Sequence, residues 1–205
     1  MLEYERSLWD KGVSRIAGID EVGRGCLFGD VVAAAVILPQ GMVLEGVNDS
    51  KKLSPVMRER LFDQILTEAV AVSYACVGVE EIERINIKMA SRLAMKIALS
   101  RLHVQPDYLL VDAEKVDSPI KQLALIHGDA LSQSIAAASI VAKVVRDRMC
   151  LEWDKQFPQY GIAGHKGYAT KLHREMLQAY GPTPLHRMSF LGKVLAVQEE
   201  FILDL

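Results

Sequence analysis

The stretch that decides the fold is IAGIDEVGRGCLFGDVVAAAVIL, residues 16–38. It contains two apolar segments, 15–20 and 31–38, which are rich in small and β-branched side chains and read as strands. The connection between them is short and contains glycine, whereas parallel neighbours need a long crossover. The pattern therefore predicts an antiparallel hairpin, with Asp20 and Glu21 where the first strand ends.

Helix and strand patterns continue on the C-terminal side of this hairpin. Ser54 has the properties of a helix N-cap and Pro55 those of a first helical residue, so a helix is expected from there to about residue 69. The further segments are expected strands at 70–79, 108–111 and 123–126, and expected helices at 80–102, 130–157, 170–179 and 190–202. This succession predicts an α/β fold with a mixed central sheet flanked by helices.

Length and composition favour one globular domain. The chain has 205 residues, half of them apolar, and a formal charge of -2. We expect a single domain over 1–205, with a C-terminal helical extension over about 170–205. The small net charge means that any nucleic-acid binding must come from a local basic patch.

Cysteine usage and hydropathy indicate the compartment. The three cysteines are widely spaced, which fits a reducing compartment better than a disulfide framework or a zinc site. No signal peptide is recognised, and the longest apolar run, 31–38, is too short to cross a bilayer. We expect a cytoplasmic protein with no membrane partner.

Acidic residues recur where apolar segments end. Asp20, Asp112 and Asp129 each follow a strand-like segment, and Glu21 adjoins Asp20. Ligand sites of α/β sheets lie beyond strand ends, so these acids are expected to converge. Strand neighbours point to opposite faces, so Asp20 and Glu21 can share a site only if the chain turns there. Clustered carboxylates repel one another, and a hard divalent cation, Mg²⁺ or Mn²⁺, would neutralise them.

Each acid also has a structural alternative. Asp129 precedes a helix and could be its N-cap, and Asp112 could be a turn residue. Asp20 and Glu21 could form a salt bridge with Arg24. The recurrence of the pattern at several strand ends favours the metal site.

Several other polar residues are candidates for binding a substrate. Lys51, Lys52 and Lys143 could contact phosphates, and Lys143 lies one helical turn after Ser139, which could instead be a packing residue. Tyr168 lies in a basic, glycine-containing loop, where its ring could stack on a sugar or base or simply pack. Further candidates for the phosphate track are Arg146, His165, Lys166, Lys171 and Arg174, each of which could instead be an ordinary surface charge. For His173 and His186, which lack metal-ligand spacing, we expect structural roles.

Ordered motifs across nearly the whole chain resemble those of ribonuclease HII, the type 2 ribonuclease H family of bacteria. The motifs are GIDEVGRG at 18–25, DSKKL at 49–53, VD at 111–112, GD at 128–129, SIAAASIVAKV at 134–144, RD at 146–147, HKGY at 165–168 and HRMSF at 186–190. The resemblance implies a ribonuclease H-like fold. It also implies a metal-dependent endoribonuclease that cuts the RNA strand of RNA–DNA hybrids. The same enzyme would nick 5′ of single ribonucleotides in duplex DNA, leaving 3′-hydroxyl and 5′-phosphate ends.

The resemblance also assigns roles to individual residues. The family's four acids, which hold Mg²⁺ or Mn²⁺, correspond to Asp20, Glu21, Asp112 and Asp129. Its glycine-arginine-glycine loop, which senses the ribose 2′-hydroxyl, corresponds to Gly23, Arg24 and Gly25, and its tyrosine that packs on the next deoxyribose corresponds to Tyr168. In such a two-metal mechanism the ions activate water and stabilise charge, so no side-chain nucleophile is needed.

Two positions depart from the family pattern. Residues 26–30 read CLFGD where PLAGP is common, and the added charge of Asp30 is expected to affect substrate affinity. His127 stands where a lysine commonly precedes Gly-Asp, which would remove a phosphate contact or make it depend on pH.

Two other functions remain alternatives. One is a catalytically silent nucleic-acid-binding module on the same fold. The other is a phosphate-binding NTPase, for which the G-x-x-x-x-G-K-[ST] motif is missing. A monomer is expected, while the preferred ion, the balance between substrates and any partner at the C-terminus are left open by the sequence.

Overall fold

A five-stranded mixed sheet forms the centre of the molecule. The computed structural model describes residues 1–47 and 53–196, with side chains to residue 192. The strands, in chain order, are β1 (Ile16–Val22), β2 (Val31–Ile37), β3 (Ala71–Val77), β4 (Tyr108–Asp112) and β5 (Gln122–Leu125). Their spatial order is β3-β2-β1-β4-β5. The first three strands are antiparallel and β4 and β5 run parallel to β1, which confirms the predicted hairpin and mixed sheet.

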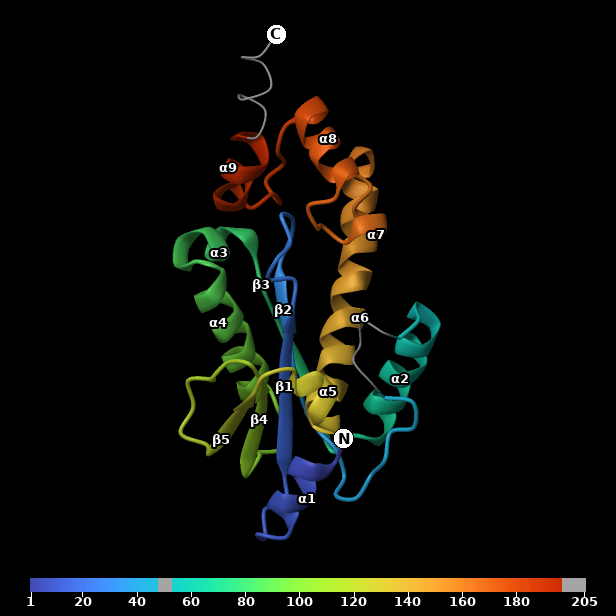
Figure 1. Ribbon diagram of the computed structural model, residues 1–205, viewed down its shortest axis with the longest axis vertical. Helices are drawn as coiled ribbons and strands as arrows, with labels where there is room; N and C mark the ends of the chain where they lie inside the picture. The colour runs from blue at the N-terminus through green and yellow to red at the C-terminus, as the bar shows by residue number, and fades with distance from the viewer. Residues whose placement is uncertain (48–52, 197–205) are drawn as a thin grey trace.

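Helices cover both faces of the sheet. They are α1 (Glu3–Trp9), α2 (Pro55–Glu68), α3 (Val79–Ile85), α4 (Ile87–Ser100), α5 (Gly128–Leu131), α6 (Gln133–Gln156), the 3-10 turn η1 (Pro158–Tyr160), α7 (Ile162–His165), α8 (Lys171–Tyr180) and α9 (Met188–Ala196). Figure 1 shows α3 and α4 on one side of the sheet and α2 and α6 on the other. The layers are those of the predicted α/β fold, and α8 and α9 lie beyond the end of the sheet, where a C-terminal helical extension was expected.

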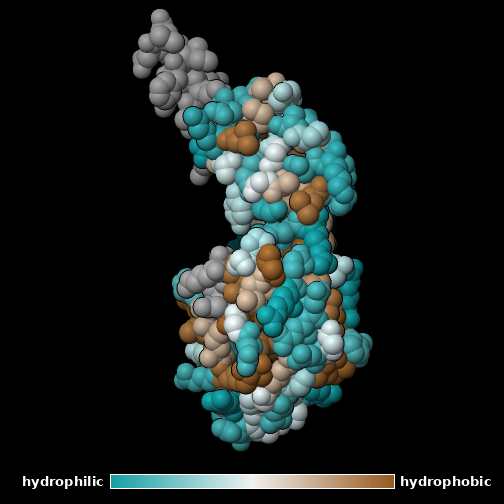
Figure 2. Space-filling model, turned by 90° about the vertical axis from the view of Figure 1, so that its right-hand side faces the viewer, coloured by the Kyte–Doolittle hydropathy of each residue, from teal (hydrophilic) through white to brown (hydrophobic). Residues whose placement is uncertain are grey.

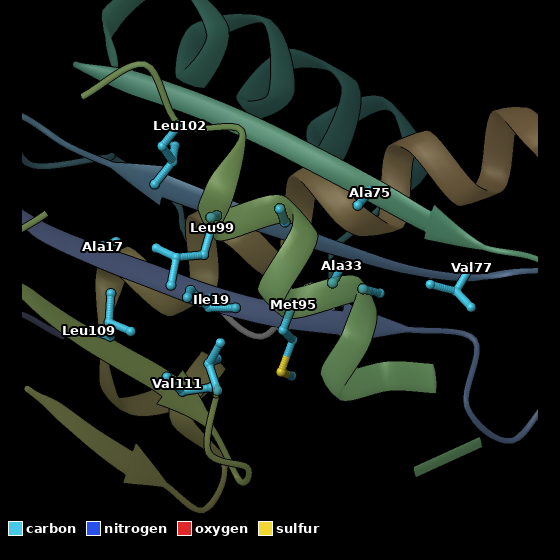
Figure 3. Close-up of a cluster of buried hydrophobic side chains, with 14 of the residues drawn as sticks. Ala17, Ile19, Ala33, Ala75, Val77, Met95, Leu99, Leu102, Leu109 and Val111 are labelled. Atoms are coloured by element: carbon cyan, nitrogen blue, oxygen red, sulfur yellow. The ribbon is translucent and has the colours of Figure 1, made fainter. Parts of the chain in front are cut away.

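The face toward α4 is a closely packed apolar layer. Alternation along β1 places Ala17 and Ile19 on this face, where both are fully buried. Figure 3 shows Met95 and Leu99 of α4 reaching toward these two side chains. Small residues such as Ala33 of β2 allow the helix to approach the sheet closely, which accounts for the alanine-rich sequence of this strand.

The opposite face brings the backbone of α6 directly onto β1. A Cβ atom at Gly18 would lie 2.0 Å from the carbonyl carbon of Ser134, so only glycine is tolerated there. The first half of α6 is buried and consists largely of small residues, as the sequence predicts. Asp20 follows Gly18 on the same face and therefore points toward α6.

Two long helices expected from the sequence are each divided in two. The expected helix at 80–102 breaks at Asn86, which has a φ of 68° and accepts a hydrogen bond from the Met89 N–H. The expected helix at 130–157 breaks at Ser132, whose hydroxyl accepts from the Ile135 N–H. Both break residues are strong N-caps, so local capping outweighs the continuous apolar pattern.

Smaller differences concern where the elements end. β1 continues to Val22, so Asp20 and Glu21 lie inside the strand and not beyond it. The segment 158–170, expected as a loop, contains η1 and α7. The helix that begins at Pro55 is confirmed, with Ser54 as its N-cap accepting from the Met57 N–H.

The start of α6 is held by a buried carboxylate from α1. Glu5 is 1% exposed, and its Oε1 accepts hydrogen bonds from the Ser132 hydroxyl at 2.6 Å and the Ser134 N–H at 2.9 Å. A negative charge at a helix N-terminus interacts favourably with the helix dipole. Glu5 thereby positions the helix that carries Ser139 and Lys143.

The C-terminal segments close around the β1–β2 loop. The Leu27 N–H donates to the Gly167 carbonyl and the Gly29 N–H to the Leu185 carbonyl, both at 2.8 Å. Figure 1 shows α7, α8 and α9 gathered beyond this end of β1, and the space-filling view narrows below them (Figure 2). Among the described residues, no helix is long and apolar enough to span a membrane.

Replacing Glu5 with alanine should lower the free energy of unfolding by about 1–3 kcal/mol, because two buried donors at the start of α6 lose their acceptor. Urea denaturation of the parent and the variant measures this change. Glu3→Ala, an exposed position on the same helix, is the control and should shift stability by less than about 0.5 kcal/mol. Equal effects of the two substitutions would contradict the capping role.

Candidate active site

Two adjacent parallel strands bring the first acids together. β1 pairs with β4 so that Ile19 lies opposite Val111, and the next residue on each strand is an aspartate. Asp20 is 5% exposed, and Asp112 is the last residue of β4. The sheet register therefore places Asp20 and Asp112 side by side, as expected from the sequence.

Asp20 and Glu21 approach this point from the two faces of β1. Asp20 hydrogen-bonds with the Ser139 side chain on α6, and its Oδ1 accepts from the Glu21 N–H at 2.7 Å. Glu21 turns toward the other face, where its Oε1 accepts from Arg24 Nη1 at 3.1 Å. β1 continues through both residues to Val22, so the strand end that was predicted at Asp20 was wrong, and a metal site shared by the two acids stays a prediction.

The proximity of the carboxylates perturbs their protonation. Burial raises the pKa of Asp20 well above its ordinary value, and the charges of Glu21 and Asp112 raise it further, while hydrogen bonds from Ser139 and the Glu21 N–H lower it. Burial also raises the pKa of Glu21, against the hydrogen bond and charge of Arg24. The carboxylates of Asp20, Glu21 and Asp112 therefore carry more negative charge than Arg24 alone can balance.

Asp112 is oriented by the start of α5. Its Oδ1 accepts from the Gly128 N–H at 2.6 Å, and a Cβ at Gly128 would lie 3.2 Å from the same oxygen. Asp129 is the next residue and is 7% exposed in the first turn of α5. Because His127 precedes α5 and Ser132 caps α6, the N-cap alternative for Asp129 was wrong.

The donor set suits a hard divalent cation. Glu21 Oε2 is buried and has no hydrogen-bond partner within the described residues, while Arg24 binds the other oxygen and Asp112 and Glu114 add negative charge nearby. Such oxygen donors are the ligands that Mg²⁺ and Mn²⁺ prefer. Over residues 1–47 and 53–196, no three His, Cys, Asp or Glu side chains stand together as a preformed metal site. The carboxylates would therefore have to draw together around an ion.

Two buried arginines hold the loop that follows the acids. Arg187 donates to the carbonyls of Gly23 at 2.8 Å and Gly29 at 2.7 Å, and also to that of Arg24. Arg146 donates to the carbonyls of Phe28 and Asp30, each at 3.0 Å. Burial lowers the pKa of Arg187 to about 10. In the sequence, Arg187 stands out only as part of the motif HRMSF, with no role of its own, and Arg146 only as one candidate phosphate contact among several.

Glycine is required at the point where this loop leaves β1. Gly23 has a φ of 95°, and a Cβ there would lie 2.3 Å from Arg146 Nε. No other residue could adopt this conformation so close to the buried guanidinium. The glycine-arginine-glycine segment is thus a turn held in place by the two buried guanidiniums that contact it.

Tyr168 lies beside the same loop. A Cβ at Gly25 would be 3.9 Å from Tyr168 Cε1, and the tyrosine is 45% exposed. Its hydroxyl shares a hydrogen bond with the Cys26 thiol, which also donates to the Lys166 carbonyl at 3.4 Å. The structure therefore brings together the two parts that the sequence analysis assigned to sugar recognition.

The departure at Asp30 has a structural explanation. Burial raises the pKa of Asp30, and the charges of Arg187 and Arg146 oppose this rise. The negative charge of Asp30 therefore interacts favourably with these two buried guanidiniums. Its predicted effect on substrate affinity stays a prediction.

The predicted phosphate contacts have different outcomes. Lys143 Nζ donates to Asp147 Oδ1 at 2.6 Å, one turn along α6 from Ser139. Lys51 and Lys52 lie outside the described residues. His127 is exposed, with a left-handed φ of 57°, and its contact with phosphate stays a prediction.

The two histidines act within the C-terminal packing. His173 and His186 are buried, and their Nε2 atoms lie 3.1 Å apart. The His186 ring packs edge-on against Phe28, with 4.7 Å between the ring centroids. Burial lowers the pKa of each to about 4, so both are neutral near pH 7. This arrangement agrees with the structural role that was predicted.

Replacing Asp20 with asparagine should raise the melting temperature of the metal-free protein at pH 9. The raised pKa means that the ionised carboxylate destabilises the fold at high pH and that this cost disappears as the pH falls through the raised value. The gain, about 2–4 °C per kcal/mol for a chain of this size, should therefore shrink at pH 5.

Thermal melts at the two pH values, with and without Mn²⁺, measure this effect. Asp63→Asn, at an exposed position of α2, is the control. Mn²⁺ should stabilise the parent more than Asp20→Asn. A variant that melts below the parent at pH 9, or gains equally from Mn²⁺, is incompatible with a ligand role for Asp20.

Comparison with known proteins identifies the family and the fold of the chain. The family model described as "Ribonuclease HII" matches residues 17–193. Ribonuclease HII of Alkaliphilus metalliredigens is 58% identical over 200 residues, covering 95% of this chain and 98% of that protein. Ribonuclease H2 from Pyrococcus horikoshii has a TM-score of 0.75 at 24% identity, covering 91% of this chain and 98% of that one. The structure of Bst-RNase HIII in complex with Mn²⁺ has a TM-score of 0.70 at 18% identity, covering 92% and 71%. The chain belongs to the ribonuclease HII family and is an endonuclease of the ribonuclease H type.

Proposed function

We propose that this ribonuclease H uses Mg²⁺ or Mn²⁺ held by Asp20, Glu21, Asp112 and Asp129. It cuts the RNA strand of RNA–DNA hybrids and nicks duplex DNA 5′ of single ribonucleotides, leaving 3′-hydroxyl and 5′-phosphate ends. One observation carries the proposal: buried carboxylates adjoin a rigid glycine loop that has an exposed tyrosine ring beside it.

The chain's own residues prepare the carboxylates for a cation. The hydrogen bond from Ser139 favours the ionised form of Asp20, and the Gly128 N–H orients Asp112. When bound, divalent ions would activate the attacking water and stabilise the charge that develops on the phosphate. Mn²⁺ in the structure of Bst-RNase HIII, which has the same fold, supports the choice of ion.

The loop and Tyr168 would divide sugar recognition between them. Arg187 binds the carbonyls of Gly23 and Arg24, so the loop backbone is held in one conformation next to the acids. A backbone fixed in this way can offer a close polar contact to a 2′-hydroxyl, which distinguishes RNA from DNA. The ring of Tyr168 would pack on the next sugar, where a 2′-hydroxyl would crowd it.

The phosphate backbone would run past α6. Lys143 lies one turn of α6 after Ser139, whose side chain hydrogen-bonds with Asp20. A substrate phosphate would compete with Asp147 for the Lys143 ammonium group. Lys51 and Lys52 stay predicted contributors on the strength of their motif. A monomeric state and a cytoplasmic location also stay predictions.

A catalytically silent binding module is the weaker alternative. All four acids of the family motif are present, and the chain belongs to a family of enzymes. Nothing in the glycine loop matches the phosphate-binding motif of an NTPase.

Tyr168→Ala should reduce cleavage at a single embedded ribonucleotide by roughly ten- to a hundredfold, because one packing contact worth about 1–3 kcal/mol is lost. Cleavage inside a long RNA–DNA hybrid should fall less, since no deoxyribose follows the cut there. End-labelled duplexes of both kinds, incubated with Mn²⁺, measure the two rates.

Tyr74→Ala is the matched control, because this tyrosine is 47% exposed on β3 and has a similar surface. It should leave both rates unchanged. If the parent cuts hybrids but leaves the single-ribonucleotide duplex intact, recognition of the junction is absent and the enzyme acts on hybrids only.

His127→Lys should lower the Michaelis constant more at pH 8 than at pH 6. Lysine stays charged at both values, whereas histidine is the side-chain type that changes charge within this pH range. Steady-state kinetics on a hybrid at the two pH values, with the exposed His103→Lys as control, test this contact. An equal change at both pH values would show that residue 127 does not contact phosphate.

A further inference from the structure

A chain of four charged side chains connects the acid cluster to α4. Arg24 Nη1 lies 3.1 Å from Glu21 Oε1 and 3.4 Å from Glu114 Oε1. The other oxygen of Glu114 accepts from Arg92 Nε at 3.0 Å and from Nη2 at 2.8 Å. Glu114 therefore bridges two arginines: Arg24 of the glycine-arginine-glycine loop and Arg92 of α4, which packs against the sheet.

The backbone before Glu114 is shaped to aim it at this position. Ala113 has a φ of 50°, a left-handed conformation that is unfavourable for a residue with a Cβ. Its N–H donates to the Leu125 carbonyl at 2.9 Å, and the Glu114 N–H donates to the Asp112 carbonyl at 2.5 Å. The chain thus turns back directly after β4, and the Glu114 side chain is only 12% exposed.

Arg24 pairs with two carboxylates, Glu21 and Glu114, and only the first of them is a proposed cation ligand. Under the function proposed above, Glu21 binds a divalent cation, and its Oε1 is then no longer a good partner for a guanidinium. Glu114 belongs to no ligand set proposed here and is held on its far side by Arg92. Glu114 can therefore hold the Arg24 side chain in place both with and without a cation at Glu21.

We propose that Glu114, supported by Arg92, is a positioning residue that keeps the Arg24 side chain in place beside the acids when Glu21 binds a divalent cation. The inference rests on the proposed function, because it requires cation binding by Glu21 and substrate contact by Arg24. It concerns binding more than chemistry, so the Michaelis constant should respond and kcat should change little.

The first test is a double-mutant cycle on Arg24→Ala and Glu114→Ala. With a long RNA–DNA hybrid and Mn²⁺, Glu114→Ala should raise the Michaelis constant roughly tenfold, with kcat within about twofold of the parent. In the Arg24→Ala background it should have almost no further effect, because its partner is gone. Glu114→Gln keeps an acceptor oxygen and should lie between the parent and Glu114→Ala.

Asp117→Ala is the matched control. Asp117 lies on the same β4–β5 connection and pairs with Lys96 of α4 at 2.7 Å, and no recorded contact joins it to Arg24. Its substitution removes an ion pair between the same two elements. The Michaelis constant should stay at the parental value.

The second test measures binding without turnover, by fluorescence anisotropy of a labelled hybrid. Glu114→Ala should weaken binding roughly tenfold in Ca²⁺, and clearly less in EDTA, where Glu21 still holds Arg24. Equal weakening in the two conditions would overturn the proposal. So would an unchanged Michaelis constant, or an effect that persists in the Arg24→Ala background and marks a purely structural role.

Failure of the proposed function gives a different result. A parent protein that cuts no RNA-containing duplex with Mg²⁺ or Mn²⁺ would contradict the activity itself. A parent that cuts normally while Glu114→Ala behaves like it would contradict only the positioning role.

Discussion

The close approach of α6 to Gly18 of β1 is the contact on which the site depends. Because no Cβ separates the two backbones, Asp20, two residues further along the same face, is brought against Ser139. A larger residue at position 18 would push α6 outward and remove the hydrogen bond that favours the ionised form of Asp20. Glu5 secures the same helix at its start, so two contacts that do not involve the acids themselves help to determine how Asp20 is presented.

The second constraint is the pair of buried guanidiniums beneath the glycine loop. Arg146 and Arg187 satisfy carbonyls that the tight turn leaves without partners in the sheet, and Asp30 balances part of their charge. Burying cations is costly unless hydrogen bonds and counter-charges compensate. The C-terminal segments thereby reach the loop that follows the acids, where Arg187 binds backbone carbonyls and Tyr168 lies beside Gly25.

The acid cluster itself works against stability. Burial raises the pKa of Asp20 and Glu21, and each negative charge disfavours ionisation of its neighbours. Such strain is typical of functional sites, where stability is given up for binding. Arg24 relieves part of it at Glu21, and a cation would relieve more. Glu114, which is itself paired with Arg92, gives Arg24 a second carboxylate partner besides Glu21.

The sequence by itself determined the antiparallel hairpin, the mixed sheet, the family and the identity of the candidate acids. These features follow from local patterns: strand alternation, N-caps and short motifs whose residues are neighbours in the chain. The same rules could have located the breaks at Asn86 and Ser132, since both are common N-cap residues. Only the tertiary structure decided that Arg187 holds the carbonyl of Gly23, that Arg146 holds that of Asp30, and that Glu114 pairs with Arg24. The partners of those contacts are up to 164 residues apart, as with Arg187 and Gly23. Their pairing depends on how helices and strands pack, and no local pattern carries that information.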